Sequence, residues 1–166
     1  RLPFLDIHLT GNRSDRQLTG RALVNPAAWR QLDSQRRFEW ALLRRMHSLG
    51  DVSLDILEAD SSWTLVFYDD AATLYLRRDG AYAHLADSCG YRLLRAGRVG
   101  MARMTLLFTG DSTQRRALRV ELDRMVTSSR ANSGGHSMLS QLDRLEGRWS
   151  ESRAHLIEAH RVDPLV

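Results

Sequence analysis

The stretch SSWTLVFYDDAATLYLRRD, residues 61 to 79, decides the fold because it holds two apolar runs of strand length around a short polar segment. Aromatic and β-branched residues in such runs fit a pleated, half-buried surface. The residues DDAA between the runs are typical of a turn. The stretch therefore predicts a buried β-hairpin. The two faces that it offers to a core are Trp63, Leu65 and Phe67 on one side, and Val66 and Tyr68 on the other.

Two segments that precede the hairpin also have strand composition. FLDIHL, from Phe4 to Leu9, alternates in character, and FEWALL, from Phe38 to Leu43, is a compact apolar run between arginine pairs. We expect both to be strands, with a helix as the alternative for the second. Tyr91 to Leu94 has strand-like character as well.

Short helices are expected between these strands. Asn25-Pro26 combines a capping residue with a proline at the first helical position, so a short helix should follow. Thr10 to Thr19 is either an exposed loop or the start of a short helix, since it is rich in Gly, Asn, Ser and Asp. Asp51 to Asp60 and Ala81 to Ala86 predict one or two helical turns each.

From Asp111 onward the apolar period changes from two to 3.6. Asp111-Ser112-Thr113 offers caps for a helix of residues 112 to 128, and Thr127 to Gly135 has loop composition. Beyond that loop, Gly147 separates two apolar stripes, which predict two antiparallel helices. The stripes are Met138, Leu142 and Leu145, then Trp149, Leu156, Ala159 and Val162.

These elements predict an α/β (α+β) fold: a small mixed sheet with short helices, followed by a C-terminal helical hairpin. We expect two parts, a small α/β domain over residues 1–95 and a helical region over residues 96–166.

The composition is that of an ordinary soluble globular protein, with 166 residues that are 43% hydrophobic and 27% charged. No apolar run approaches the roughly 18 to 20 residues that span a bilayer. The chain opens without Met on a strand-like segment, from which we expect a piece of a longer protein. Its single cysteine, Cys89, lacks metal-ligand spacing and is expected to be a small, partly buried core residue.

All 24 basic residues are Arg, and the net charge is +4. Residues 1–90 hold 11 Arg against 12 acids, whereas residues 91–166 hold 13 Arg against 8 acids, so the second part is the basic one. Nucleic-acid surfaces need clustered cations with stacking aromatics. Here the Arg are spread along helical segments among Asp and Glu, so we expect no nucleic-acid partner.

No segment contains a convincing catalytic or cofactor motif, so we expect neither an enzyme site nor a cofactor. Asp69-Asp70 has the composition of a metal or acid–base pair, but a polar pair between two strands is more often a turn. Asp6 and His8 lack a third ligand for a metal. His155 and His160 lack zinc-protease spacing, and Gly97, Gly100 and Gly110 lack the Lys-Ser/Thr of a phosphate loop.

Residues 136 to 164 resemble a single tetratricopeptide repeat, a helix-turn-helix unit of about 34 residues. The matching residues are Leu139, Gly147, Trp149, Leu156, Ala159 and the closing Asp163-Pro164. The sequence departs from the repeat at Ser152, where a small Ala is usual, and at Asp143, where an aromatic is usual. A solitary repeat cannot bury both faces, so it is expected to stack on the helix of residues 112–128 or on further repeats.

Residues 2 to 78 are similar to the soluble domain that follows the membrane spans of proteins related to lipid-linked-sugar glycosyltransferases, including protein mannosyltransferases that use dolichyl-phosphate mannose. The order FLDIHLTG, NPAAW, FEWALL and SSWTLVFYDDAATLYLRR carries this resemblance. It implies an extracytoplasmic (periplasmic-side), accessory domain whose parent is a membrane protein, with the catalytic acid in loops outside this chain.

The sequence therefore favours a non-catalytic accessory or protein-interaction domain whose partner is a protein or peptide. The alternative is a part of a membrane glycosyltransferase that shapes acceptor access or regulates the enzyme. For the first reading we expect a basic partner-binding rim on the helical pair. Its residues are Arg130, Arg144, Arg148, Arg153 and Arg161.

Overall fold

The computed structural model describes residues 13–45 and 51–165, which form eight helices and three strands. The predicted strand of residues 4–9 lies outside the described part. In chain order the elements are α1 (Arg13–Ala22), α2 (Pro26–Arg36), β1 (Trp40–Arg44), α3 (Val52–Glu58), β2 (Trp63–Tyr68), β3 (Ala72–Arg77), α4 (Ala83–Cys89), α5 (Arg98–Phe108), α6 (Ser112–Ser128), α7 (Ser133–Leu145) and α8 (Trp149–Val162).

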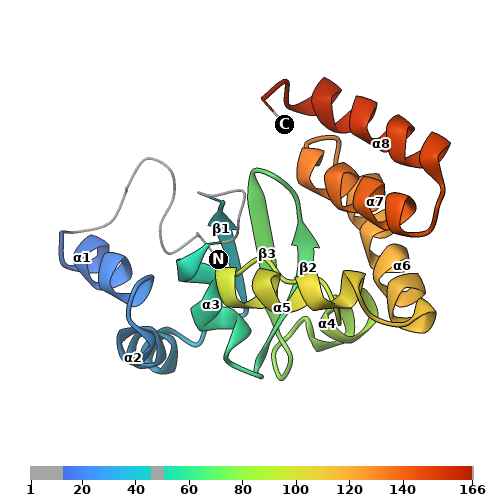
Figure 1. The fold of residues 1–166 in the computed structure, drawn as a ribbon. Coiled ribbons are helices and arrows are strands. Elements are labelled where there is room, and N and C mark those ends of the chain that lie inside the picture. The colour runs from blue at the N-terminus through green and yellow to red at the C-terminus, as the bar shows by residue number, and fades with distance from the viewer. Residues whose placement is uncertain (1–12, 46–50, 166) are drawn as a thin grey trace.

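The predicted α+β class is confirmed: a small sheet with short helices is followed by a C-terminal helical hairpin (Figure 1). The described strands form one antiparallel sheet in the order β1-β3-β2, and Asp51 and Gly97 add an isolated parallel bridge. The predicted hairpin is β2 and β3, and the FEWALL segment supplies β1. None of the described helices is long and apolar enough to cross a membrane.

A bulge in β2 corrects the predicted faces of the hairpin. Leu65 pairs with Tyr75 and Phe67 pairs with Leu74, so Val66 is the extra residue. The bulge turns the chain over, and Tyr68 instead of Phe67 follows Leu65 into the core, where it is 1% exposed. Burial raises the pKa of Tyr68 to about 12, so its phenol is neutral at physiological pH.

The second face of the sheet is only partly covered. Val66, Phe67, Leu74 and Leu76 line a shallow apolar pocket of about 490 Å³ there, together with side chains of β1 and α4. Leu42 of β1 remains largely exposed on this face.

The core lies on the other face of the sheet and runs on into the helical region. α5 crosses this face and packs against α3 and α6 (Figure 1). One hydrophobic cluster includes Trp29 and Trp63 from the first predicted domain and Leu118, Leu139 and Leu142 from the second. The division at residue 95 stays a prediction, but the two parts share this core.

Local capping signals place two helices as predicted. The Asn25 side chain accepts hydrogen bonds from the amides of Ala27 and Ala28, and Pro26 is the first residue of α2. The Asp111 carboxylate accepts one from the amide of Gln114 at the start of α6.

Other local predictions were wrong or incomplete. Residues 98 to 108 form α5, a helix that was not predicted. Residues 91 to 94, which have strand-like character, form no strand. α7 extends into a segment that was expected to be a loop, whereas α1 confirms the helical alternative for the segment from Thr10 to Thr19. Cys89 is exposed at the end of α4, not partly buried.

The bulge predicts that the two neighbouring aromatic residues of β2 contribute unequally to stability. Tyr68→Ala should lower the free energy of unfolding by about 3 to 5 kcal/mol, the usual cost of removing a buried aromatic ring. Phe67→Ala should cost less than half as much, because Phe67 lies in the partly open pocket of the second face. Chemical denaturation of both variants measures this difference. An equal loss, or a larger loss for Phe67→Ala, would contradict the assigned faces.

Candidate functional site

α7 and α8 form the antiparallel pair predicted from the sequence, at the outer end of the molecule (Figure 1). Gly147 has a φ of 74°, a left-handed conformation that glycine adopts readily, and this allows the short turn between the helices. α7 packs on α6, and α8 packs on α7. The pair is therefore stacked on α6, one of the two arrangements expected from the sequence, and further repeats stay a prediction.

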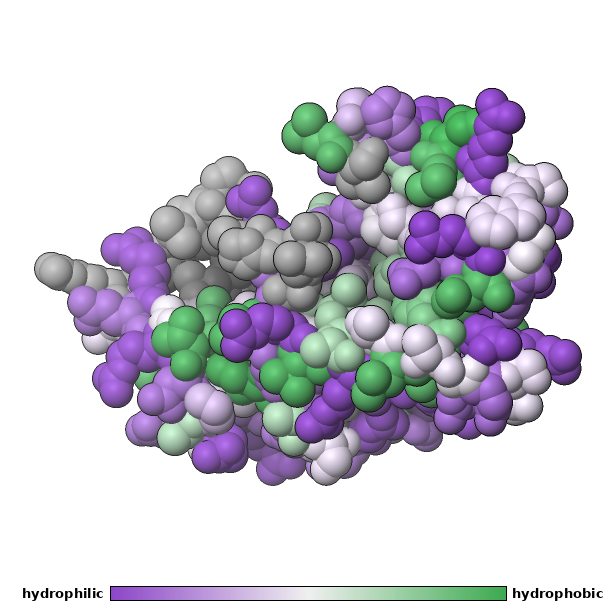
Figure 2. Space-filling model, viewed as in Figure 1, coloured by the Kyte–Doolittle hydropathy of each residue, from purple (hydrophilic) through white to green (hydrophobic). Residues whose placement is uncertain are grey.

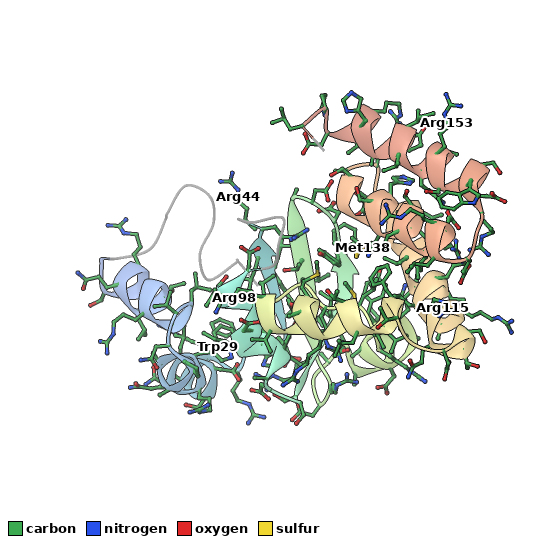
Figure 3. All side chains as sticks on the ribbon, viewed as in Figure 1. Trp29, Arg44, Arg98, Arg115, Met138 and Arg153 are labelled. Atoms are coloured by element: carbon green, nitrogen blue, oxygen red, sulfur yellow. The ribbon has the colours of Figure 1, made fainter. Side chains whose placement is uncertain are left out.

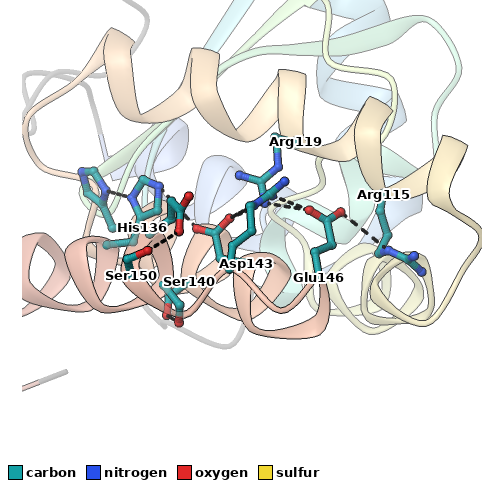
Figure 4. Close-up of polar contacts among 11 residues, drawn as sticks. Arg115, Arg119, His136, Ser140, Asp143, Glu146 and Ser150 are labelled. Atoms are coloured by element: carbon teal, nitrogen blue, oxygen red, sulfur yellow. Dashed lines mark hydrogen bonds and ion pairs between the residues drawn. The ribbon is translucent and has the colours of Figure 1, made fainter.

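An ionic cluster around one buried carboxylate joins α6 to the α7–α8 pair (Figure 4). Its centre is Asp143, whose side chain is 1% exposed. Arg119 of α6 lies 2.6 Å from Asp143 Oδ1, and Arg148, at the turn before α8, donates to the same oxygen from Nε at 3.0 Å. Glu146 lies 3.4 Å from Arg119 and also pairs with Arg148. Three segments thus meet at one carboxylate.

Smaller polar contacts continue this cluster between α7 and α8. The hydroxyls of Ser140 and Ser152 lie 2.9 Å apart and are buried. Nδ1 of His136 and Nδ1 of His155 lie 3.1 Å apart, so at least one of these two rings is neutral and accepts a hydrogen bond from the N–H of the other. Burial, followed by the charge of His155, lowers the pKa of His136, which keeps this ring neutral at neutral pH. We interpret the whole cluster as a structural joint.

The two departures from the helical-repeat pattern lie inside this joint. Asp143 stands where the repeat has an aromatic, and here it is the buried acceptor of two guanidinium groups. Ser152 stands where the repeat has alanine, and its hydroxyl meets Ser140. Polar contacts therefore hold α7 to α8 at positions where the repeat pattern has apolar packing.

The structure places the five predicted partner-binding arginines in different surroundings. Arg148 is half-exposed and belongs to the ionic cluster around Asp143, and Arg161 pairs with Glu158 at 2.7 Å. Arg130, Arg144 and Arg153 are exposed and form no ion pair within residues 13–45 and 51–165. Arg153 extends outward from α8 (Figure 3). The basic rim stays a prediction, with these three side chains as its available cations.

The structure corrects the predicted apolar stripe of α8. Ser152, His155 and Ala159 face α7, whereas Trp149 and Leu156 face outward and are 67% and 52% exposed. Ile157 is 57% exposed. Trp149, Arg153, Leu156 and His160 recur at the spacing of one helix side. We call Trp149, Arg153, Leu156, Ile157 and His160 the α8 outer face. Figure 2 shows hydrophobic residues among hydrophilic ones in the region of α7 and α8.

One feature of the sequence indicates the α8 outer face, although the predicted apolar stripe did not use it. Leu156-Ile157 is an adjacent apolar pair, and a single helix in contact with one neighbour cannot bury both residues of such a pair along with Ala159. Of the remaining candidates, Asp6 and His8 lie outside the described residues. Asp69 and Asp70 form the turn between β2 and β3, and the described residues contain no group of three or more His, Cys, Asp or Glu able to hold a metal ion.

Comparison with known proteins finds no family model, no curated protein and no solved structure that matches this chain. The resemblances to a helical repeat and to the soluble domain of glycosyltransferase-related membrane proteins therefore stay predictions.

The ionic joint predicts a large cost for losing its central carboxylate. Asp143→Ala should lower the free energy of unfolding by about 3 to 5 kcal/mol, since it removes the central acceptor of the cluster and leaves two guanidinium groups beside a buried site with Glu146 as their shared partner. Asp123→Ala on α6 is the matched control. Asp123 is exposed and its side chain makes no ion pair in the described part of the chain, so this change should stay within about 0.5 kcal/mol. Urea denaturation of both variants measures the difference, and similar small losses would contradict the joint.

Proposed function

We propose that this chain is a non-catalytic protein-interaction domain that binds an acidic, amphipathic segment of another protein on the α8 outer face. The observation that carries this proposal is the exposure of Trp149, Leu156 and Ile157 on one helix. Single exposed apolar residues are ordinary, but several large ones gathered on one element are typical of an interaction site. Tryptophan is also among the residues that contribute most to protein interfaces.

Charge favours an acidic partner over a basic one. Arg153 lies within the α8 outer face and forms no ion pair in the described part of the chain. Arg144, in the last turn of α7, is likewise exposed and unpaired there. The surroundings add to this, because residues 91–166 hold 13 Arg against 8 acids. Such cations raise the rate of encounter with an acidic segment and make binding weaken as ionic strength rises.

A pair of synthetic peptides tests this proposal. Both have leucines at i, i+3, i+4 and i+7 of a helix, and the other positions carry Glu in one peptide and Lys in the other. Fluorescence anisotropy should show saturable binding of the Glu peptide only. The double variant Trp149→Ala/Leu156→Ala should reduce its affinity by about tenfold or more, because two central apolar contacts are lost.

Leu106→Ala/Val120→Ala is the matched control, since both residues are exposed on other helices, and it should leave binding unchanged. Equal binding of both peptides, no binding of either, or an equal loss in the control would contradict the proposal. Analytical sedimentation tests the alternative that the α8 outer face binds a second copy of this chain. A dimer that becomes a monomer in Trp149→Ala/Leu156→Ala would assign the face to a second copy and overturn the acidic partner.

We propose in addition that the chain is the soluble extracytoplasmic part of a larger membrane protein, with the sheet and its helices as a rigid base for the helical pair. The support is the resemblance of residues 2–78. The alternative is an acceptor-shaping or regulatory part of a membrane glycosyltransferase whose catalytic residues lie elsewhere. The protein sequence encoded upstream of Arg1 tests whether the parent is a membrane protein or a soluble one. About ten apolar spans of roughly 20 residues there would indicate a membrane enzyme of this kind.

A further inference from the structure

Two adjoining cavities lie beside the end of α3, away from the α8 outer face. Their volumes are about 320 Å³ and 440 Å³, and Glu58, Ala59 and Arg95 line both. Arg78 lines the first cavity, and Arg92 and Arg103 line the second. We call the two cavities together the arginine pocket.

The guanidinium groups of this pocket have unused hydrogen-bond donors. Arg78, Arg92 and Arg103 are exposed, and their side chains form no hydrogen bond or ion pair with another described residue. Arg95 uses one N–H for the carbonyl oxygen of Leu94, at 3.0 Å. Each guanidinium carries five N–H donors, so most donors of the four groups remain available to a ligand.

The carboxylates of the pocket, in contrast, accept hydrogen bonds from protein donors, although Oε2 of Glu58 has no hydrogen-bond partner among the described residues. Oε1 of Glu58 accepts hydrogen bonds from the amides of Ala96 and Gly97, at 2.6 Å and 3.1 Å, and from the Tyr75 hydroxyl at 3.1 Å. Asp55 accepts one from the amide of Val99, and Asp60 accepts two from Ser62. Burial raises the pKa of Glu58. These acids therefore do not neutralise the arginines by direct contact.

We propose that the arginine pocket binds a ligand that carries a phosphate group. Guanidinium forks match the geometry of phosphate oxygens, and charge-assisted hydrogen bonds of this kind are among the strongest in proteins. Four such groups line two adjoining cavities of small-molecule size, which suits a phosphorylated small molecule or a phosphate-bearing lipid headgroup. This site is separate from the α8 outer face and does not depend on the function proposed for it.

Calorimetric titration with inorganic pyrophosphate tests the site. The wild-type chain should bind this probe saturably at low ionic strength. Changing Arg78, Arg92 and Arg103 each to Gln should weaken binding by about tenfold or more, because three charge-assisted contacts are lost. The matched control changes Arg98, Arg116 and Arg130 to Gln, which removes the same charge from exposed positions outside both cavities. Arg98 lies at the start of α5 (Figure 3).

Vesicles distinguish the two sources of phosphate. Flotation compares vesicles of phosphatidylcholine with vesicles that also contain phosphatidic acid. Binding of the second kind alone, lost in the pocket variant and kept in the control, would support the site and assign the phosphate to a lipid. An equal loss in both triple variants would reduce the effect to total charge and overturn the proposal. Absence of saturable binding to both pyrophosphate and phosphatidic acid vesicles would also overturn it.

Discussion

The turn between β2 and β3 attaches the helical pair of α7 and α8 to the sheet. Asp69 Oδ1 accepts hydrogen bonds from the amides of Ala71 and Ala72, both at 2.8 Å, and this holds the turn. The Asp70 carboxylate accepts from the amides of Ser133 and Gly134, which are the first two residues of α7. One carboxylate therefore caps a helix 63 residues further along the chain.

The chain around this contact is adapted to it on both sides. The Ser129 hydroxyl donates to Asp69 Oδ2 at 2.8 Å, and Asp70 donates its own amide to the carbonyl oxygen of Ala131 at 2.9 Å. A Cβ atom on Gly134 would lie 3.1 Å from Asp70 Oδ1, and one on Gly135 would lie 2.7 Å from Val126. Small residues are thus needed where α7 starts. Because such residues are typical of loops, the sequence did not predict the first turn of this helix.

Carboxylates that bind distant backbone amides explain several other differences between prediction and structure. Tyr91 to Leu94 has the composition of a strand, but Glu121 of α6 accepts hydrogen bonds from the amides of Arg92, Leu93 and Leu94. The start of α5 is set by Asp55 and Glu58, and a Cβ on Gly100 would lie 2.3 Å from Glu58 Oε2. These contacts join residues that are 27 to 44 positions apart, so no local sequence pattern predicts them.

The features that could be predicted from the sequence are those that depend on residues close together in the chain. The hairpin follows from two apolar runs around a polar turn, and α2 and α6 follow from their capping residues. The orientation of α8 could not be read from its apolar residues, because contacts with Asp143 and Ser140 turn its polar side inward. The bulge that selects Tyr68 over Phe67 also has no local signal in this stretch. The five predicted arginines were argued from charge alone, and the structure shows which of them already have a partner.

Native-state hydrogen exchange of Asp70→Ala tests the central role of the β2–β3 turn most directly. If Asp70 fastens the helical pair to the sheet, amides of α7 and α8 should exchange faster in the variant than in the wild type, with the largest change at the start of α7. The amides that pair β2 with β3 should keep their protection, because Asp69 still closes the turn. Unchanged exchange in α7 and α8, or an equal loss of protection throughout the described residues, would contradict this account.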